Sequence, residues 1–270
     1  MKFKLSSKYR PIFLLLFFWL IEELTEDFIY GPLLDKQKSG SFLMINSEYK
    51  LLVMVTLVIL NKVCIKQRIY FNFSTYALKN KLKSLIFLFI FIGYFVITPM
   101  LDHPERLREA FIIGLIAAIP EEYLFRGIIL GNLLKNTSFI SCKYKQIFIC
   151  LLISSLTFSM AHISNITTQS VLATLLQIIQ VFGYGTILGA LYIKTGSLLF
   201  PIITHFTLDF AITLVNGTSS TVHGSFMINL IGTLIITVLC VIIAANIIKS
   251  AKKLKLFDKL NEHIETKNYF

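Results

Sequence analysis

Three charged side chains interrupt a hydrophobic run that extends from Phe111 to Leu134. An apolar run of this length predicts a membrane-spanning helix. A charged side chain at bilayer depth costs at least about 2.5 kcal/mol, so such side chains normally face the protein interior and have partners. Glu122 and Arg126 are four positions apart and share one helix face, so we expect them to form an ion pair. Glu121 is rotated by about 100° from Glu122 and has no partner within this motif.

The composition is that of a membrane protein. Of the 270 residues, 55% are hydrophobic and only 15% are charged, and the mean hydropathy is +0.72. These values lie outside the range of ordinary soluble domains, so we expect an all-α fold, a polytopic integral membrane helical bundle. A net charge of +11 would suggest nucleic acid as the partner of a soluble protein. Here the basic residues lie in predicted loops and tails, which predicts contact with membrane lipid and no nucleic-acid partner.

The apolar runs predict about eight transmembrane helices. Basic residues cluster before the first, after the second, fourth and sixth, and after the eighth. Since basic residues concentrate in cytoplasmic loops, we expect a multi-pass protein of the cell membrane with both termini in the cytoplasm. The predicted spans cover residues 11–30, 49–65, 84–101, 110–134, 145–163, 171–194, 197–216 and 225–248.

Two further predicted spans carry ionisable groups in apolar surroundings. One ends at Phe158-Ser-Met-Ala-His162, and another contains His205 and Asp209, which share a helix face because they are four positions apart. A single histidine on an apolar face is more often a satisfied core residue. Three spans that present two carboxylates and two histidines instead indicate a site, because burial and neighbouring charge tune such groups for proton transfer. This set, in which Glu121 and Asp209 are the two carboxylates, has the chemistry to activate a water molecule.

The motifs resemble those of the CPBP family of intramembrane proteases, also called the Abi or CAAX-protease-and-bacteriocin-processing family, which includes the CAAX prenyl endopeptidases. The family order is Glu-Glu-x-x-x-Arg, then Phe-x-x-x-His, then His-x-x-x-Asp/Asn. The chain has this order at Glu121–Arg126, Phe158–His162 and His205–Asp209. The run Tyr192–Pro201 is also similar to what precedes the last motif in bacterial members. The resemblance covers about residues 110–215.

The resemblance implies hydrolysis of a peptide bond inside an all-helical membrane fold. Glu121 would be the general base, and His162 would help to hold and activate the water. His205 and residue 209 would stabilise the oxyanion of the tetrahedral intermediate. Members with asparagine at the last position have an amide donor there, whereas an ionised Asp209 is an acceptor. Either Asp209 is protonated, or it orients His205 by accepting its ring N–H, and we favour the second role.

The resemblance also divides the chain into three parts. Residues 1–109 would hold the first three spans and a cytoplasmic interfacial segment, and residues 110–215 would form the catalytic core. Residues 216–270 would hold the last span and a basic cytoplasmic tail. Within the core, Gly185 and Gly189 form a G-x-x-x-G pattern, which predicts close helix packing inside the bundle.

Metal chemistry is the alternative mechanism, because family members have also been described as metalloproteases. Two histidines and a carboxylate could fill three zinc positions and leave the fourth to water. The sequence has no H-E-x-x-H spacing, the pattern that makes a zinc prediction strong. We therefore expect glutamate chemistry without a cofactor and keep zinc as the alternative.

Helix lengths predict that His162 lies at a different depth in the membrane from the other site residues. From Lys145 to His162 is about 25 Å of helix, against about 16 Å from Lys194 to His205. On straight helices, His162 would lie nearer the outer face than its partners. Either the basic residues before this span lie well outside the membrane core, or the span is tilted or broken.

Three functions fit the sequence. The first is an endopeptidase that acts on a prenylated protein, a bacteriocin leader or signalling peptide, or a membrane-embedded remnant. The second is a non-catalytic membrane regulator or immunity protein. The third is a transporter, against which stands the lack of an internal repeat in the sequence. The Lys-, Ile- and Asn-rich composition indicates a low-GC bacterium, which favours peptide processing or bacteriocin self-immunity over CAAX removal.

Overall fold

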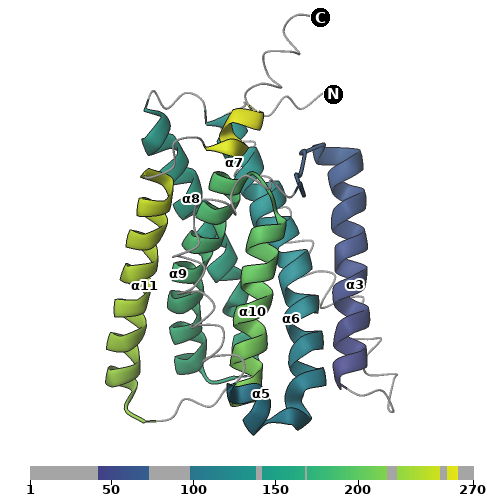
Figure 1. The fold of residues 1–270 in the computed structure, drawn as a ribbon, viewed down its shortest axis with the longest axis vertical. Helices are drawn as coiled ribbons and strands as arrows, with labels where there is room; N and C mark the ends of the chain where they lie inside the picture. The colour runs from purple at the N-terminus through teal and green to yellow at the C-terminus, as the bar shows by residue number, and fades with distance from the viewer. Residues whose placement is uncertain are drawn as a thin grey trace, which may run out of the picture.

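The computed structural model describes residues 42–72, 98–137, 142–167, 169–217, 224–249 and 254–260. The described residues form helices and their connections, without a strand, and the long helices lie side by side along one axis (Figure 1). The all-α prediction is therefore confirmed. The predicted spans 11–30 and most of 84–101 lie outside the described residues.

Several helices change their hydrogen-bonding pattern along their length, so one span often consists of consecutive elements. Three helices are composite. The first is α3 (Phe42–Leu60) with the π turn η2 (Asn61–Ile65), the second is α6 (Leu107–Glu122) with the π-helical η6 (Tyr123–Leu130) and α7 (Gly131–Asn136), and the third is α8 (Lys143–Met160) with the 3-10 helix η7 (Ala161–Thr167). The remaining long helices are α9 (Val171–Thr195), α10 (Leu199–Asn216) and α11 (Phe226–Lys249). Short α5 (Thr98–Asp102) and η5 (Pro104–Arg106) precede α6.

Four helical segments of the described part are long and apolar enough to cross a membrane. They are Lys143–Thr167, Val171–Thr195, Leu199–Asn216 and Phe226–Lys249. The chain is thus a membrane protein by composition and helix length, although the count of eight spans is not confirmed. The continuous helix from α6 to α7 is not among the four segments, and three charged residues lie near its middle, within Glu121–Arg126.

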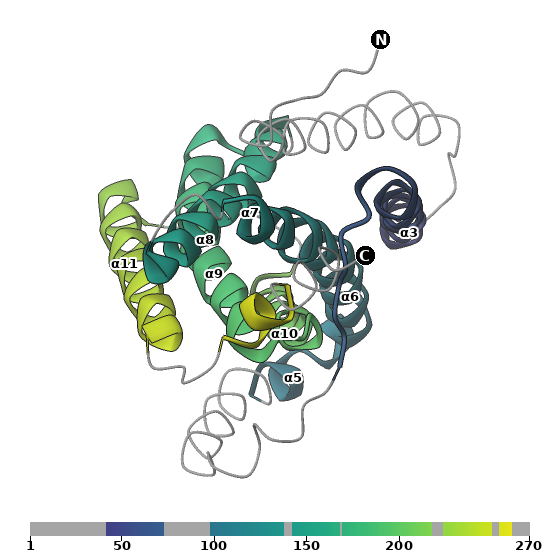
Figure 2. The same cartoon turned by 90° about the horizontal axis from the view of Figure 1, so that it is seen from above.

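Helix α9 lies at the centre of the bundle and packs against α8, α10 and α11, while α6 packs against α10. Small residues permit these close approaches, as predicted for the G-x-x-x-G pattern. A Cβ on Gly185 would lie 3.1 Å from Ser155 Cβ of α8, and one on Gly183 would lie 2.9 Å from Thr237 Cα of α11. Figure 2 shows α3 at the edge of the bundle, beside α6.

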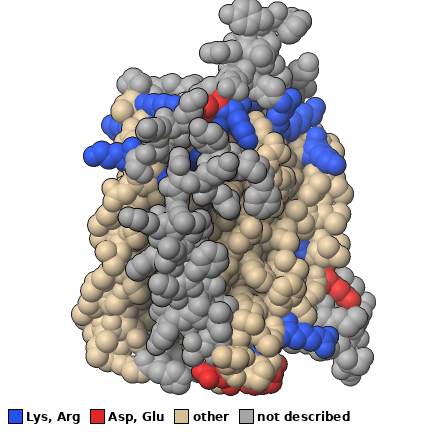
Figure 3. Space-filling view, in the orientation of Figure 1, with Lys and Arg blue, Asp and Glu red and all other residues tan. Residues whose placement is uncertain are grey.

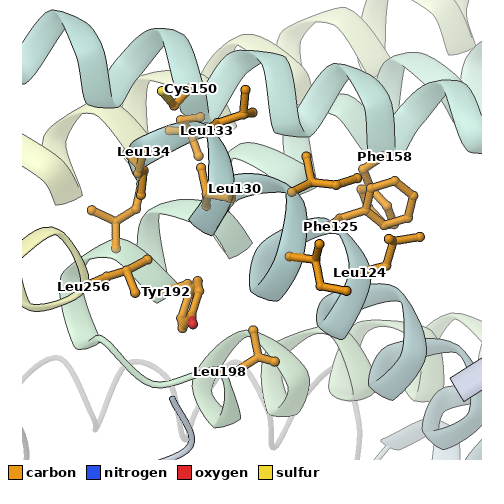
Figure 4. Close-up of a cluster of buried hydrophobic side chains, with 14 of the residues drawn as sticks. Leu124, Phe125, Leu130, Leu133, Leu134, Cys150, Phe158, Tyr192, Leu198 and Leu256 are labelled. Carbon is orange, nitrogen blue, oxygen red and sulfur yellow. The ribbon is translucent and has the colours of Figure 1, made fainter. Parts of the chain in front are cut away.

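The buried core extends from the middle of the bundle to one end. Figure 4 shows Phe125 and Phe158 at one side of this core and Leu256 at the other. Leu256 belongs to the tail segment 254–260, and its side chain is completely buried. The tail therefore folds back onto the bundle, where the Lys259 ammonium donates to the carbonyl of Gly196 at 3.0 Å.

The two ends of the bundle differ in charge. Helices α3, α7, α9 and α11 end, and α8 and α10 begin, at the end where Lys and Arg side chains gather in Figure 3. Toward the opposite end of the face shown, acidic side chains appear together with fewer basic ones. The basic residues at the first end include Lys62, Lys66, Arg68, Lys135, Lys143, Lys145, Lys194 and Lys249.

Candidate active site

The first motif lies where α6 becomes a π-helix. Pro120 lies inside α6 and has no N–H to donate, and the wider π pattern begins three residues later, at Tyr123. All eight residues of η6 are buried. Single π turns inside α-helices occur frequently at functional sites.

Glu122 and Arg126 form the predicted ion pair, and neither side chain is exposed. Arg126 Nη1 donates to Glu122 Oε1 at 2.6 Å. The guanidinium carbon lies 4.1 Å from the centre of the Phe158 ring, and Nη2 donates to the carbonyl of Gly185 at 3.4 Å. These contacts hold the arginine against α8 and α9, so it organises the centre of the bundle.

His205 of α10 joins the acidic residues of α6. Its Nδ1 lies 2.9 Å from Glu122 Oε1, and its Nε2 lies 3.2 Å from Asp209 Oδ2. Nε2 is also 3.8 Å from Glu121 Oε2. The contact between His205 and Asp209 is the one expected from their spacing, and it has the geometry in which Asp209 accepts the ring N–H.

Glu121 has partners from other helices. Besides its contact with His205, its Oε1 lies 3.6 Å from Lys50 Nζ of α3. The Glu121 side chain is 15% exposed, whereas that of Glu122 is completely buried. Of the two adjacent carboxylates, Glu121 is therefore the one that another molecule can reach.

His162 lies on the 3-10 helix η7, which begins at Ala161. The hydrogen-bonding pattern of the span thus changes directly before this residue, within one helical segment that runs from Lys143 to Thr167. The ring of Phe158 makes edge contacts with His162 and with His205, at centroid distances of 5.2 and 5.7 Å. His162 Nδ1 lies 3.1 Å from the carbonyl of Phe158. A carbonyl only accepts, so Nδ1 carries the hydrogen and Nε2 of a neutral ring is an acceptor.

The charges of this cluster balance when His205 carries two ring hydrogens. Three carboxylates then face three cations, and both His205 nitrogens donate to carboxylates. In a low-dielectric interior an uncompensated charge is costly, which favours this neutral arrangement. The groups are Glu121, Glu122, Asp209, Lys50, Arg126 and His205.

Among the described residues, no three or more His, Cys, Asp or Glu side chains are grouped to hold a metal ion. His205 directs both of its nitrogens at carboxylate oxygens.

All six residues predicted from the motifs lie in this part of the bundle, and their catalytic roles stay predictions. Sequence reasoning missed Lys50, because the second span was expected to begin at residue 49, which would put the lysine at a helix end. Helix α3 begins at Phe42 instead. A lysine two turns inside an apolar helix is itself a signal for a buried acidic partner.

A sequence model of the family described as type II CAAX prenyl endopeptidase Rce1-like matches residues 104–211. No curated protein and no solved structure matches the chain. The matched region begins just before α6 and ends in α10, so it contains all six motif residues. Over residues 104–211, the chain is therefore similar to CAAX-type intramembrane endopeptidases, in agreement with the resemblance that its motifs carry.

Proposed function

We propose that this protein hydrolyses a peptide bond of a membrane-associated protein or peptide with a water molecule activated by Glu121. The observation that carries the proposal is the partial exposure of this carboxylate beside a buried, charge-balanced cluster. A general base must be reachable by water and held in place, and Glu121 meets both requirements.

Each neighbouring residue has a role in this proposal. Glu121 takes a proton from water, and the acceptor nitrogen of His162 holds the same water. The resulting hydroxide attacks the carbonyl carbon of the scissile bond, and protonated Glu121 returns the proton to the leaving amine. Asp209 and Glu122 orient the ring of His205 beside Glu121, and Arg126 fixes Glu122.

The substrate class remains the family's general one, a membrane-associated chain. The matching family is described as a type II CAAX prenyl endopeptidase. We propose instead that peptide processing or bacteriocin self-immunity is the role, because the Lys-, Ile- and Asn-rich composition favours a low-GC bacterial source. We also propose that the basic end of the bundle and both chain termini face the cytoplasm.

A variant series in the source cell tests this function. Peptides of the membrane and culture medium are compared by mass spectrometry for Glu121→Ala, Glu121→Gln and His162→Ala, with protein abundance checked by blot. We expect specific processed peptides to disappear in all three variants while the protein is still made. Unchanged peptides would instead identify the cluster as structural and the protein as a non-catalytic regulator or immunity protein.

We further propose that no metal ion takes part. Treatment of the purified protein with 1,10-phenanthroline, followed by its removal, is expected to leave the rate of cleavage unchanged. Loss of cleavage that returns on addition of zinc would contradict this proposal.

A further inference from the structure

Lys50 adds a cation to the candidate active site from outside the region that the family description covers. The residue belongs to α3, whereas the family match begins at residue 104. Its ammonium nitrogen lies 3.6 Å from Glu121 Oε1, and its side chain is 23% exposed. It therefore lies beside the partly exposed carboxylate that we propose as general base.

The position of Lys50 is fixed by the packing of α3. Tyr49, Val53 and Leu57 are buried and follow one another at intervals of four residues, which forms a stripe on one helix face. Helix α3 packs against α6, the helix that carries Glu121. On another face, Leu51 is 67% exposed. Lys50 therefore lies beside the buried stripe, directed toward the α6 carboxylate.

Peptide hydrolysis requires a group that stabilises negative charge. When water attacks the carbonyl carbon, the electron pair of the C=O double bond moves to the oxygen and forms an oxyanion. Donors or cations near this oxygen supply a large part of the rate enhancement. They must lie beside the position of the attacking water, and hence beside Glu121.

The other cationic and donor groups of the cluster point at partners inside the bundle, whereas Lys50 lies beside Glu121 with a partly exposed side chain. Both nitrogens of His205 face carboxylate oxygens, and an ionised Asp209 is an acceptor that would repel an oxyanion. The guanidinium of Arg126 is completely buried between Glu122, Phe158 and the carbonyl of Gly185. Nδ1 of His162 donates to a backbone carbonyl.

We propose that Lys50 is a further catalytic residue whose ammonium group binds the carbonyl oxygen of the scissile bond and stabilises the oxyanion. This inference rests on the proposed hydrolytic function. An ammonium carries three N–H donors, so it can contact Glu121 and a carbonyl oxygen together. When the intermediate collapses, the oxyanion re-forms the C=O bond, the C–N bond breaks, and Glu121 protonates the amine. Lys50 keeps its protons throughout.

Purified protein in lipid nanodiscs allows a direct test with Lys50→Met and Lys50→Gln. The probe is an internally quenched peptide that contains the bond whose cleavage is lost in the Glu121→Gln cells. We expect kcat to fall by about 10²–10³-fold in both variants, since this is the loss typical of one oxyanion donor. KM should stay within about threefold of the wild-type value, because the contact strengthens only in the transition state. Lys50→Arg, which keeps the charge, should retain more activity than either neutral variant.

Two comparisons separate an oxyanion donor from a lysine that only holds α3 in place. Lys62→Met removes an exposed lysine from the adjoining turn η2 and should leave kcat unchanged. Adding Asp209→Asn to Lys50→Met replaces an acceptor with an amide donor beside His205, and should raise kcat by at least about tenfold over Lys50→Met. A lysine with only a packing role would not be rescued in this way.

The outcomes distinguish this inference from the proposed function. If Glu121→Gln is as active as the wild type, both are wrong. If Glu121→Gln is inactive but Lys50→Met and Lys50→Gln keep kcat within about threefold of wild type, the role of Lys50 alone is overturned. Failure of Asp209→Asn to raise the activity of Lys50→Met would also overturn the oxyanion role.

Discussion

Glu121 and Glu122 are neighbours in the sequence, yet the fold gives them different environments. Because successive helical residues are rotated by about 100°, one carboxylate points at Arg126 and the other at α3 and α10. Glu122 is completely buried and shares one oxygen between Arg126 and His205. Glu121 is partly exposed and contacts Lys50. The buried glutamate is a structural anchor, and the accessible one carries the proposed chemistry.

The buried ion pair of Glu122 and Arg126 is expected to stabilise the fold. Arg126→Met leaves the Glu122 carboxylate buried without its arginine, which should lower the free energy of unfolding by about 3–5 kcal/mol. The double variant Glu122→Gln/Arg126→Met contains no buried charge at these positions and should recover most of this loss. The midpoint of thermal unfolding in detergent measures both. A single variant as stable as the wild type would contradict the assignment of this pair as an anchor.

For single residues, the sequence predicted the six motif residues of the candidate active site but not all of their partners. The spacings of Glu122 with Arg126 and of His205 with Asp209 are local, and helical geometry alone predicts those contacts. The contact between Glu121 and Lys50 joins two helices that are far apart in the sequence. Spacing along one helix carries no information about such a contact.

The elements that position the site depart from the regular α-helix. Helix α6 widens to a π pattern after Glu122, and α8 tightens to a 3-10 pattern before His162. The helix lengths predicted a tilted or broken span, or basic residues well outside the membrane core, and this stays a prediction. Changes in hydrogen-bonding pattern depend on packing with other helices, so the local sequence does not determine them.

Close packing of α9 against α11 predicts the effect of a single added methyl group. A Cβ on Gly183 would lie 2.9 Å from the backbone Cα of Thr237, so Gly183→Ala must push the two helices apart. We expect a loss of about 1–3 kcal/mol in the free energy of unfolding. Gly232→Ala is the control, because a Cβ there would have no atom within 4 Å. Equal stability of the two variants would show that α9 and α11 do not pack as described.

The tail segment 254–260 is expected to stabilise the bundle through burial rather than through charge. Leu256 is completely buried, so Leu256→Ala should lower the free energy of unfolding by about 2–5 kcal/mol. Asp258→Asn removes an exposed ion pair with Lys143 and should change the free energy of unfolding by less than about 1 kcal/mol. Thermal unfolding of both variants checks the difference. A larger effect of Asp258→Asn would mean that the tail is held by charge.

Across the whole molecule, the sequence predicted the membrane class and the separation of charge. The spans predicted at 49–65, 110–134, 145–163, 171–194, 197–216 and 225–248 each correspond to helices of the structure. Basic residues at the ends of these helices gather at one end of the bundle (Figure 3). Apolar run length is a direct consequence of bilayer thickness, which is why this level of organisation is readable from composition.

The orientation in the membrane can be tested with two reporters on one span. Cys142 is exposed at the basic end of α8, and Thr167 lies at the other end of the same 25-residue segment. In variants with Cys142 or Thr167→Cys as the single cysteine, a membrane-impermeant maleimide applied to intact cells should label only Thr167→Cys. Disrupted cells, in which both sides are accessible, are the control. Labelling of Cys142 in intact cells would reverse the proposed orientation.

The central claim, water activation by Glu121, is tested most directly with heavy oxygen. Purified protein is incubated in H₂¹⁸O with membranes from cells that lack it, and the released peptides are analysed by mass spectrometry. The proposed hydrolysis predicts new C-terminal carboxyl groups that contain one ¹⁸O atom, formed by the wild type and absent with Glu121→Gln. Labelled products in equal amounts from both proteins, or none from either, would contradict the claim.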